Sequence, residues 1–173
     1  MKQELENPYQ SLSGTQAVEE IRTVAKAAGI CLFGTLLDRA PLTVRPMAVQ
    51  SVDDAGNIWF LSSRASHTNR HIEEDARVQL LFANPGKSEY MTLQGRASIS
   101  DDRALREEHW TPLAKTWFNE GVDDPDLTVI KVEAADGYYW DTKHGRMVSF
   151  IKMAAGAVAG KTLDDSVEGK MRL

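Results

Sequence analysis

Cysteine is nearly absent from this sequence, and its scarcity excludes two kinds of cross-link. The 173 residues include one cysteine, Cys31. A single thiol cannot form a disulfide within the chain, and it cannot build a zinc site from several cysteines. Cys31 lies in the apolar stretch ICLFGTL (residues 30–36), where we expect a small buried thiol rather than a nucleophile.

Long apolar runs and an excess of positive charge are also missing. No stretch reaches the roughly 18 apolar residues typical of a membrane span. The polar start MKQELENPYQ lacks the apolar centre of a signal peptide. The formal net charge is −5, the pI is about 5.4, and no basic stripe is present. We therefore expect a cytoplasmic protein that binds neither membranes nor nucleic acid.

The signatures of several enzyme classes are absent as well. The chain contains neither of the glycine-rich nucleotide motifs GxGxxG and GxxxxGK[ST], and it contains no GxSxG nucleophile motif. The segment EEHW is not the zinc-hydrolase motif HExxH. His67 and His71 are four residues apart near Glu74 and Asp75, but no third ligand is evident. We expect these side chains to form a solvated helix face without a metal.

Strand-like segments dominate what remains. Two turn-like links, DDAGN (53–57) and NPGKS (84–88), predict hairpins between successive strands. The six predicted strands cover residues 30–36, 42–52, 58–63, 78–83, 89–100 and 128–142. Strands joined mainly by hairpins predict one mainly β domain over residues 1–173, an antiparallel closed or partly open barrel with its core at about 15–142.

Helices are predicted at the periphery of this barrel. Residues 13–28 have one apolar face, a capping-box pair at Ser13 and Gln16, and a stop at Gly29. Further helices are predicted over residues 66–76 with Ser66 as N-cap, over 101–118 with a break near Pro112, and over the apolar segment 146–160, which precedes a polar tail.

The strand TVRPMAVQSV (43–52) carries an arginine and a proline side by side. Pro46 cannot donate to a sheet ladder, so it favours an edge strand or a backbone that faces a ligand. Arg45 is then either a solvated side chain or a ligand for an anion. The next strand ends in FLSSRASH (60–67), where hydroxyls, an arginine and a helix N-terminus follow one another. Such a strand end is well suited to holding a phosphate.

These residues resemble those of a known family. Residues 30–142 are similar to the flavin-binding split-barrel superfamily of pyridoxamine 5′-phosphate oxidase, and within it to the general-stress-protein-26-like branch. The resemblance is carried by RPM (45–47), WFLSSRASH (59–67), the hairpin at 78–102 and the segment 105–133. The paired tryptophans and the DDPD run of the last segment are its most specific features.

The resemblance implies a six-stranded antiparallel split barrel and a homodimer with one FMN in each of two clefts at the subunit interface. It places Arg45 on the phosphate side of FMN and Pro46 and Met47 near the isoalloxazine. The strand residues Phe60, Leu61, Ser62 and Ser63 run along the ring, and Ser66 holds the phosphate at the start of its helix.

The neighbouring positions complete the implied site. Relatives usually carry a lysine where this chain has Thr68, and a threonine supplies no charge. His67 could compensate for the missing charge, as could nearby arginines. Trp110 and Trp117 wall the cleft from the partner chain, or belong to the core.

The implied chemistry belongs to the flavin, and two functions stay open. One is an FMN-dependent oxidoreductase acting on an unidentified small substrate, with no catalytic side chain evident. The other is a non-catalytic protein that binds, stores or senses flavin in stress. Oxidation of pyridoxamine phosphate itself is not expected, because no arginine-rich substrate pocket is recognisable. A third alternative is a deazaflavin, or haem held by His67 or His144.

Overall fold

The computed structural model describes residues 9–142 and 166–173. The predicted apolar segment 146–160 and His144 lie outside these residues. The described helices are α1 (Gly14–Ala28), α2 (His67–Glu74) and α3 (Arg103–His109), with 3₁₀ helices η1 (Pro112–Thr116) and η2 (Gly121–Asp123). The described strands are β1 (Leu12–Ser13), β2 (Ile30–Thr35), β3 (Thr43–Ala48), β4 (Ser51–Val52), β5 (Ile58–Ser63), β6 (Arg77–Asn84), β7 (Glu89–Ser100), β8 (Leu127–Thr142) and β9 (Ser166–Arg172).

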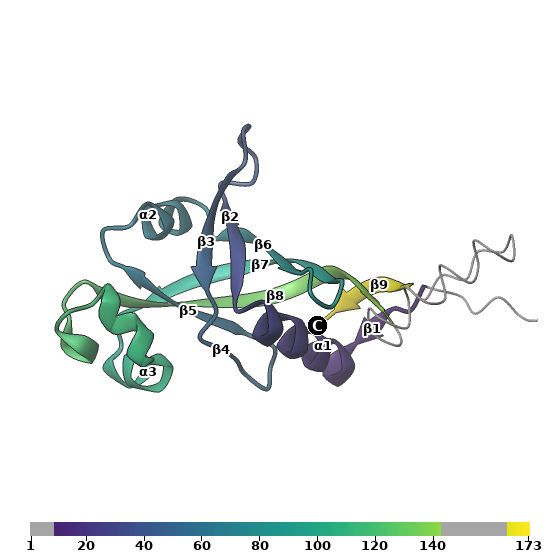
Figure 1. The fold of residues 1–173 in the computed structure, drawn as a ribbon. Coiled ribbons are helices and arrows are strands. Elements are labelled where there is room, and N and C mark those ends of the chain that lie inside the picture. The colour runs from purple at the N-terminus through teal and green to yellow at the C-terminus, as the bar shows by residue number, and fades with distance from the viewer. Residues whose placement is uncertain (1–8, 143–165) are drawn as a thin grey trace, which may run out of the picture.

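The strands form one curled sheet with an open seam. Six of them follow one another in the antiparallel order β3-β2-β6-β7-β8-β5. No pairing among the described strands joins β3 to β5, so the barrel stays split there. Figure 1 shows α2 and α3 near one end of the long strands β7 and β8, and β1 and β9 near the other. The prediction of a mainly β split barrel with peripheral helices is confirmed.

The predicted strand at residues 42–52 is interrupted. The chain changes direction at Val49 and Gln50, so its first part, β3, pairs with β2 and its last part, β4, pairs with β5. The two turning residues bond in different directions, because Val49 N–H donates to Gly29 O and Gln50 N–H donates to Trp59 O. A single straight strand could not reach both partners across the seam.

The tail, predicted only to be polar, contains a strand over residues 166–172. These residues form β9, which pairs antiparallel with β8 and parallel with β1. Val167 and Met171 are buried in the main core, so the core extends beyond the predicted limits of about 15–142. The alternation of apolar Val167, small Gly169 and apolar Met171 is the strand signal in this tail. Its pairing depends on the far half of β8, which the sequence alone does not place beside it.

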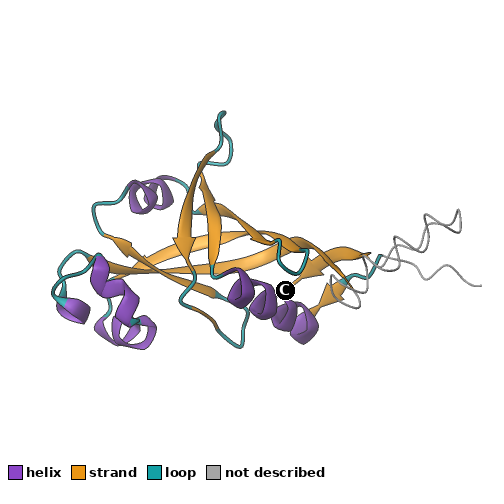
Figure 2. Ribbon diagram, viewed as in Figure 1, coloured by secondary structure: helices purple, strands orange, loops and turns teal. Residues whose placement is uncertain are grey.

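The core lies between the inner faces of the strands and one face of α1. Phe33 and Phe60 meet edge to face at its centre, with ring centroids 5.3 Å apart. From α1, Ile21 and Val24 are buried against the sheet. Figure 2 shows that the strands make up the body and the helices lie around it. Cys31 is 1% exposed, and burial raises the pKa of its thiol to about 12, which confirms the predicted inert thiol.

The predicted helix boundaries are mostly confirmed. Gly29 ends α1 with φ 69° and donates its N–H to Ala25 O. The Ser13 side chain makes no capping hydrogen bond, so the predicted capping box does not form and α1 begins at Gly14. Ser66 caps α2 by accepting from Asn69 N–H.

The predicted helix over residues 101–118 is divided at the expected place. Asp102 caps its first part by accepting from the N–H of Leu105. This part, α3, ends at His109, and Pro112 begins the separate 3₁₀ helix η1. Proline cannot continue an α-helix because its ring displaces the preceding turn, but its fixed φ suits the first helical position.

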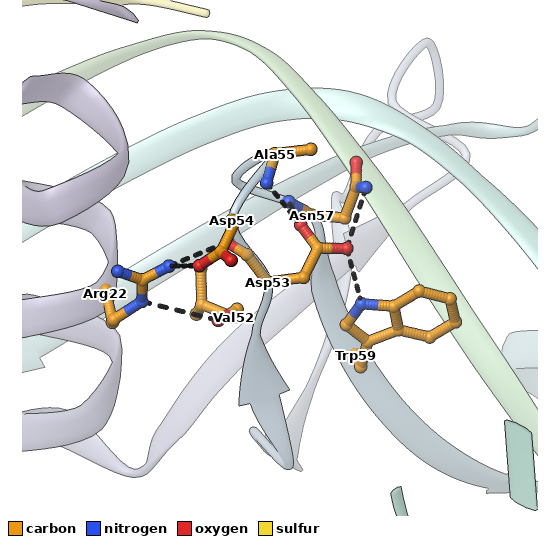
Figure 3. A network of polar contacts seen from close by, with 7 residues as sticks. All are labelled: Arg22, Val52, Asp53, Asp54, Ala55, Asn57 and Trp59. Carbon is orange, nitrogen blue, oxygen red and sulfur yellow. Dashed lines mark hydrogen bonds and ion pairs between the residues drawn. The ribbon is translucent and has the colours of Figure 1, made fainter. Parts of the chain in front are cut away.

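A polar network attaches the β4–β5 hairpin to α1 (Figure 3). The Asp53 carboxylate accepts from Ala55 N–H, from the backbone and side chain of Asn57, and from the indole Nε1 of Trp59 at 3.0 Å. Burial alone would raise the pKa of Asp53, but these hydrogen bonds hold it below its ordinary value. Arg22 of α1 donates to Asp53 O at 3.0 Å. The turn is thereby fixed on both sides.

None of the described helices is long and apolar enough to span a membrane.

Three carboxylates lie near one another at the end of the barrel away from α2. Burial first, and then the negative charges of Asp141 and Glu89, raise the pKa of Glu20 on α1 to about 6. The folded state therefore binds a proton at Glu20 more tightly than the unfolded chain does. It follows that this site favours folding below about pH 4.5 relative to neutral pH, and that the advantage is lost as pH rises through about 6.

We expect Glu20→Gln to raise the free energy of unfolding by about 1 kcal/mol near neutral pH. The reason is that a neutral side chain replaces a carboxylate that is disfavoured by burial and by the charges of Asp141 and Glu89. Near pH 4.5 the gain should largely disappear, since Glu20 is then protonated in the folded state. Urea unfolding at the two pH values measures both. The exposed neighbour Glu19 provides the matched control, Glu19→Gln, for which no such gain is expected. An equal gain in both variants would contradict the role of burial.

Candidate ligand-binding groove at the open seam

A groove of about 400 Å³ follows the open seam, and we refer to it as the seam groove. It has three walls. One wall comes from β3 and the residue after it, one from the end of β5 and the start of α2, and one from η1 and its flanks. The lining residues are Arg45, Pro46, Met47, Ala48 and Gln50; Leu61, Ser62, Ser63, Ser66 and Thr68; and Thr111, Leu113, Ala114, Trp117 and Phe118.

The β3 wall carries the only charged side chain among the described residues that line the groove. Arg45 is half-buried and stands opposite Phe33 in the β2–β3 register, on the inner face of the sheet. Its positive charge reaches α2: burial lowers the pKa of His71, and the charge of Arg45 lowers it further. Among the described strands β3 pairs with β2 alone, so Pro46 lies on an edge strand as predicted.

The wall formed by β5 and α2 is a row of hydroxyl groups. Ser62 Oγ and Ser66 Oγ are 3.0 Å apart, at the N-terminus of α2. Ser62 is held from behind, because Thr128 donates to its carbonyl at 2.9 Å and accepts from Asn69 Nδ2 at 2.9 Å. Thr128 is 1% exposed and Asn69 is 2% exposed. A buried bonded network of this kind holds the end of β5 in place before any ligand arrives.

The η1 wall is apolar and open to solvent. Leu113 is 64% exposed and Trp117 is 65% exposed, although both border the groove. Behind them Ala114 and Phe118 are buried in a small cluster with Leu127. The groove therefore has a polar side with one cation and an apolar side with one indole. A ligand that joins an anionic group to a planar apolar ring matches both sides.

The structure brings eight of the eleven predicted cofactor residues together. The residues of this set that line the seam groove are Arg45, Pro46, Met47, Leu61, Ser62, Ser63, Ser66 and Thr68. Thr68 is 1% exposed and so presents little of its surface to the groove.

Three predicted residues lie elsewhere. Phe60 is fully buried, because the alternation of β5 directs it into the core while Leu61 faces the other way. His67 is exposed on α2, where its Nδ1 is 3.1 Å from Arg70 Nη2. Trp110 packs against the Ala114 cluster instead of lining the groove, and Trp117 is the tryptophan of the wall.

Two polar residues of the groove escaped prediction. Thr111 Oγ1 donates to Gln50 Oε1 at 3.1 Å, which joins the η1 wall to the chain after β3. Gln50 follows the strand break and Thr111 precedes Pro112, so both occupy turning points of the backbone. The only sequence signal at Thr111 was its position before a proline.

A second hollow, of about 620 Å³, lies over β6–β9 and is lined by residues such as Gln79, Gln94 and Lys170. It is larger, and its lining includes Ser13, the N-cap residue of α1. The seam groove is the better candidate because it gathers eight of the residues that the sequence predicted. Within residues 9–142 and 166–173, no three His, Cys, Asp or Glu side chains lie close enough to hold a metal ion.

Comparison with known proteins agrees with this architecture. The family model described as pyridoxamine 5′-phosphate oxidase like matches residues 16–164. The protein bli-3 of Neurospora crassa is 26% identical over 129 residues, which cover 69% of this chain and 62% of bli-3. The chain spans about three fifths of the length of the curated relatives that it matches.

Solved structures show the same fold. A crystal structure assigned to general stress protein 26 from Jannaschia sp. CCS1 matches with a TM-score of 0.77 and 23% identity, covering 90% of this chain and 97% of the other. The general stress FMN/FAD binding protein from Xanthomonas citri matches with a TM-score of 0.61 and 24% identity, covering 71% and 89%.

The hydroxyl wall leads to a prediction about stability. Thr128→Val keeps the shape of the side chain but removes the donor to Ser62 O and the acceptor for Asn69 Nδ2. We expect the free energy of unfolding to fall by about 1–3 kcal/mol, the cost of leaving buried polar groups unpaired. Urea unfolding measures this loss. The exposed Thr116→Val serves as control, and a comparable loss there would show that the Thr128 network contributes nothing special.

Proposed function

Because the chain belongs to the pyridoxamine 5′-phosphate oxidase-like family, we propose that it is a general-stress-type flavoprotein that binds FMN in the seam groove. The single observation that carries this proposal is the two-sided character of the groove, with Arg45 and hydroxyls on one side and an apolar wall on the other. The description of the Xanthomonas citri structure as an FMN/FAD binding protein supports the choice of ligand.

The phosphate of FMN is assigned to the polar side. Arg45 provides the charge, and Ser63 and Ser66 provide hydroxyls beside the N-terminus of α2. Charge-assisted hydrogen bonds and the positive end of a helix are the interactions that proteins use for phosphates. Thr68 adds no charge, so Arg45 acts without a second cation among the lining residues.

The isoalloxazine ring is assigned to the space between Pro46, Met47 and the apolar residues Leu61 and Trp117. The edge of β3 that faces the seam has no strand partner among the described residues. Its backbone N–H and C=O groups can therefore bond the polar edge of a heterocycle. Pro46 has no N–H to leave unpaired in this edge.

Bound flavin would supply hydride or electron transfer, and the chain's own residues would bind and orient it. Within residues 9–142 and 166–173, no Asp, Glu, His, Cys, Lys or Tyr lines the seam groove. We therefore propose an oxidoreductase in which an unidentified small substrate meets the ring without help from a protein acid or base. Arg45 is the only cation in the lining, so a substrate that carries its own phosphate, such as pyridoxamine phosphate, is not expected.

The same observation favours a second candidate function. A groove without an acid or base also suits a protein that binds, stores or senses flavin in stress without turnover. Haem is a weaker alternative, because His67 lies outside the groove and His144 lies outside the described residues. A deazaflavin would use the groove as FMN does.

We also propose that two copies associate and that each FMN lies at their interface. The outer faces of β2 and β3 expose a row of apolar side chains beside the groove. Ile30 is 56% exposed, Leu32 is 45% exposed and Val44 is 40% exposed. Pro46 of the same face lines the groove, so a partner that covers this face would also close the site. Sedimentation velocity at several concentrations tests the proposed dimer.

The deciding experiment is an absorption spectrum of the purified protein with and without added FMN, followed by anaerobic addition of a reduced nicotinamide. A bound flavin that bleaches with the donor and recovers with an acceptor supports the oxidoreductase. A flavin that stays oxidised with every physiological donor supports the binding or sensing role. Absence of flavin binding after FMN is supplied would overturn the proposal.

We expect Arg45→Ala to weaken FMN binding by about 1.5–3 kcal/mol, the scale of a hydrogen bond to a charged group. The same substitution should weaken the binding of riboflavin, which lacks the phosphate, by much less. Fluorescence titration with both ligands measures the difference. Arg70→Ala removes an exposed arginine of α2 outside the groove lining and should leave FMN binding unchanged. Equal affinities of Arg45→Ala and the unmodified protein would remove Arg45 from the site.

A further inference from the structure

The last residue of α3, His109, is a buried histidine with an unusual set of neighbours. It is 6% exposed, and its ring stacks on the indole of Trp59, with centroids 4.2 Å apart and planes 19° apart. Its Nδ1 lies 3.1 Å from Ser51 Oγ. Its other nitrogen, Nε2, is buried and has no hydrogen-bond partner among the described residues.

This histidine stands directly before the η1 wall. Two residues later, Thr111 Oγ1 donates to Gln50 Oε1 at 3.1 Å. Gln50 in turn donates its side-chain N–H to Ala48 O at 3.1 Å and its backbone N–H to Trp59 O at 2.9 Å. The contacts Ser51–His109 and Gln50–Thr111, which we call the latch, join the chain before η1 to the chain after β3.

The latch connects the β4–β5 turn to the η1 wall. On the turn side, Trp59 donates to Asp53, and Arg22 of α1 holds the same turn (Figure 3). On the other side, the η1 wall places Leu113 and Trp117 largely in solvent and packs on Leu127 through Ala114 and Phe118. The latch is the side-chain link between that wall and the chain after β3.

We propose that His109 is a positioning residue that holds the η1 wall over the flavin groove, and that it does so only as a neutral imidazole. The proposal rests on the proposed flavin site and adds to it a dependence of ligand affinity on acid. His109 does not line the groove itself, so it acts through Thr111 and the wall that follows.

The charged groups around His109 do not offset the cost of burying its ring in the charged imidazolium form. Glu108 on α3 and Asp53 in the β4–β5 turn are its acidic neighbours, and both would raise its pKa. Burial nevertheless lowers the pKa of His109 below its ordinary value. The Asp53 carboxylate is already occupied by Asn57 and Trp59. Strands β4 and β5 contribute the uncharged contacts Ser51 and Trp59 to the ring.

The imidazolium carries an N–H on each ring nitrogen, and the N–H on Nε2 is buried with no acceptor among the described residues. That cost is relieved when the ring leaves the latch. In the open state His109 regains its ordinary pKa of about 6.5. The latch is therefore closed above about pH 6.5 and loses stability as pH falls below that value. For each unit by which closure lowers the pKa of His109, the equilibrium constant for closing the latch can fall up to about tenfold at acid pH.

The test measures the dissociation constant of riboflavin between about pH 5 and pH 8, because riboflavin has no phosphate that titrates in the same range. We compare the unmodified protein with His109→Asn, whose Oδ1 and Nδ2 can still bond Ser51 but cannot titrate. The unmodified protein should bind more weakly at the acid end than at pH 8, and His109→Asn should bind with nearly constant affinity. The exposed control His67→Asn should keep the acid dependence.

A second variant guards against loss of folding at position 109. Thr111→Val removes the other contact of the latch without changing the histidine, so it should weaken riboflavin binding while keeping the acid dependence. Superimposable pH profiles for the unmodified protein and His109→Asn would overturn the proposal. Affinities in Thr111→Val equal to those of the unmodified protein would overturn it as well.

Hydrogen exchange without ligand separates this proposal from the flavin assignment. At acid pH, peptides covering residues 110–118 should exchange faster in the unmodified protein than in His109→Asn at the same pH, while those covering 67–74 should not differ. If no variant binds flavin but this difference is present, the proposed function fails and the latch stands. If flavin binds and residues 110–118 exchange alike in both proteins, the latch is wrong.

Discussion

The pairing of β8 with three other strands is the constraint on which the rest of the fold depends. One edge of β8 pairs with β7, while the other edge pairs first with β5 and then with β9. Close approach along this strand requires glycine. A Cβ on Gly95 would meet Glu133 O at 2.3 Å, and one on Gly137 would meet Thr92 O at 2.7 Å. The register shift at Gly95 bends the ladder there. The curled sheet then leaves β3 and β5 on either side of the seam, where they do not pair with each other.

The seam groove inherits its chemistry from this arrangement. Strand β5 brings its serines to the first turn of α2, and β8 supplies Thr128 to hold them. Strand β3 contributes Arg45 from the inner face and an unpaired backbone edge. The third wall comes from η1, whose attachment at residues 109–111 is side chain to side chain rather than through a sheet. A polar side held by the Thr128–Asn69 network therefore faces an apolar side joined to the chain after β3 through side chains, and the proposed pH dependence acts on that link.

Features that depend on residues close together in the sequence were predicted well, and features that depend on residues far apart were missed. Alternation of apolar residues identified all six barrel strands, because side-chain alternation is a local property of each strand. Alternation also predicts that Phe60 and Leu61 point to opposite faces of β5. The resemblance nevertheless placed both beside the ligand, and the structure buries Phe60 in the core. Strand β9 was missed because its partner is a distant half of β8. The break at Val49 was missed because only the seam requires it.

The sequence by itself determined the number of barrel strands, the cap at Ser66, the break before Pro112 and the donors that gather near Arg45. Each depends on periodicity, backbone sterics or hydrogen bonds within a few residues. Only the tertiary structure decided that Trp117 rather than Trp110 borders the groove, that Gln50 meets Thr111 and that His109 is buried against Trp59. These contacts join residues about 50 to 60 positions apart, so they exist only once the sheet has curled and left its seam open.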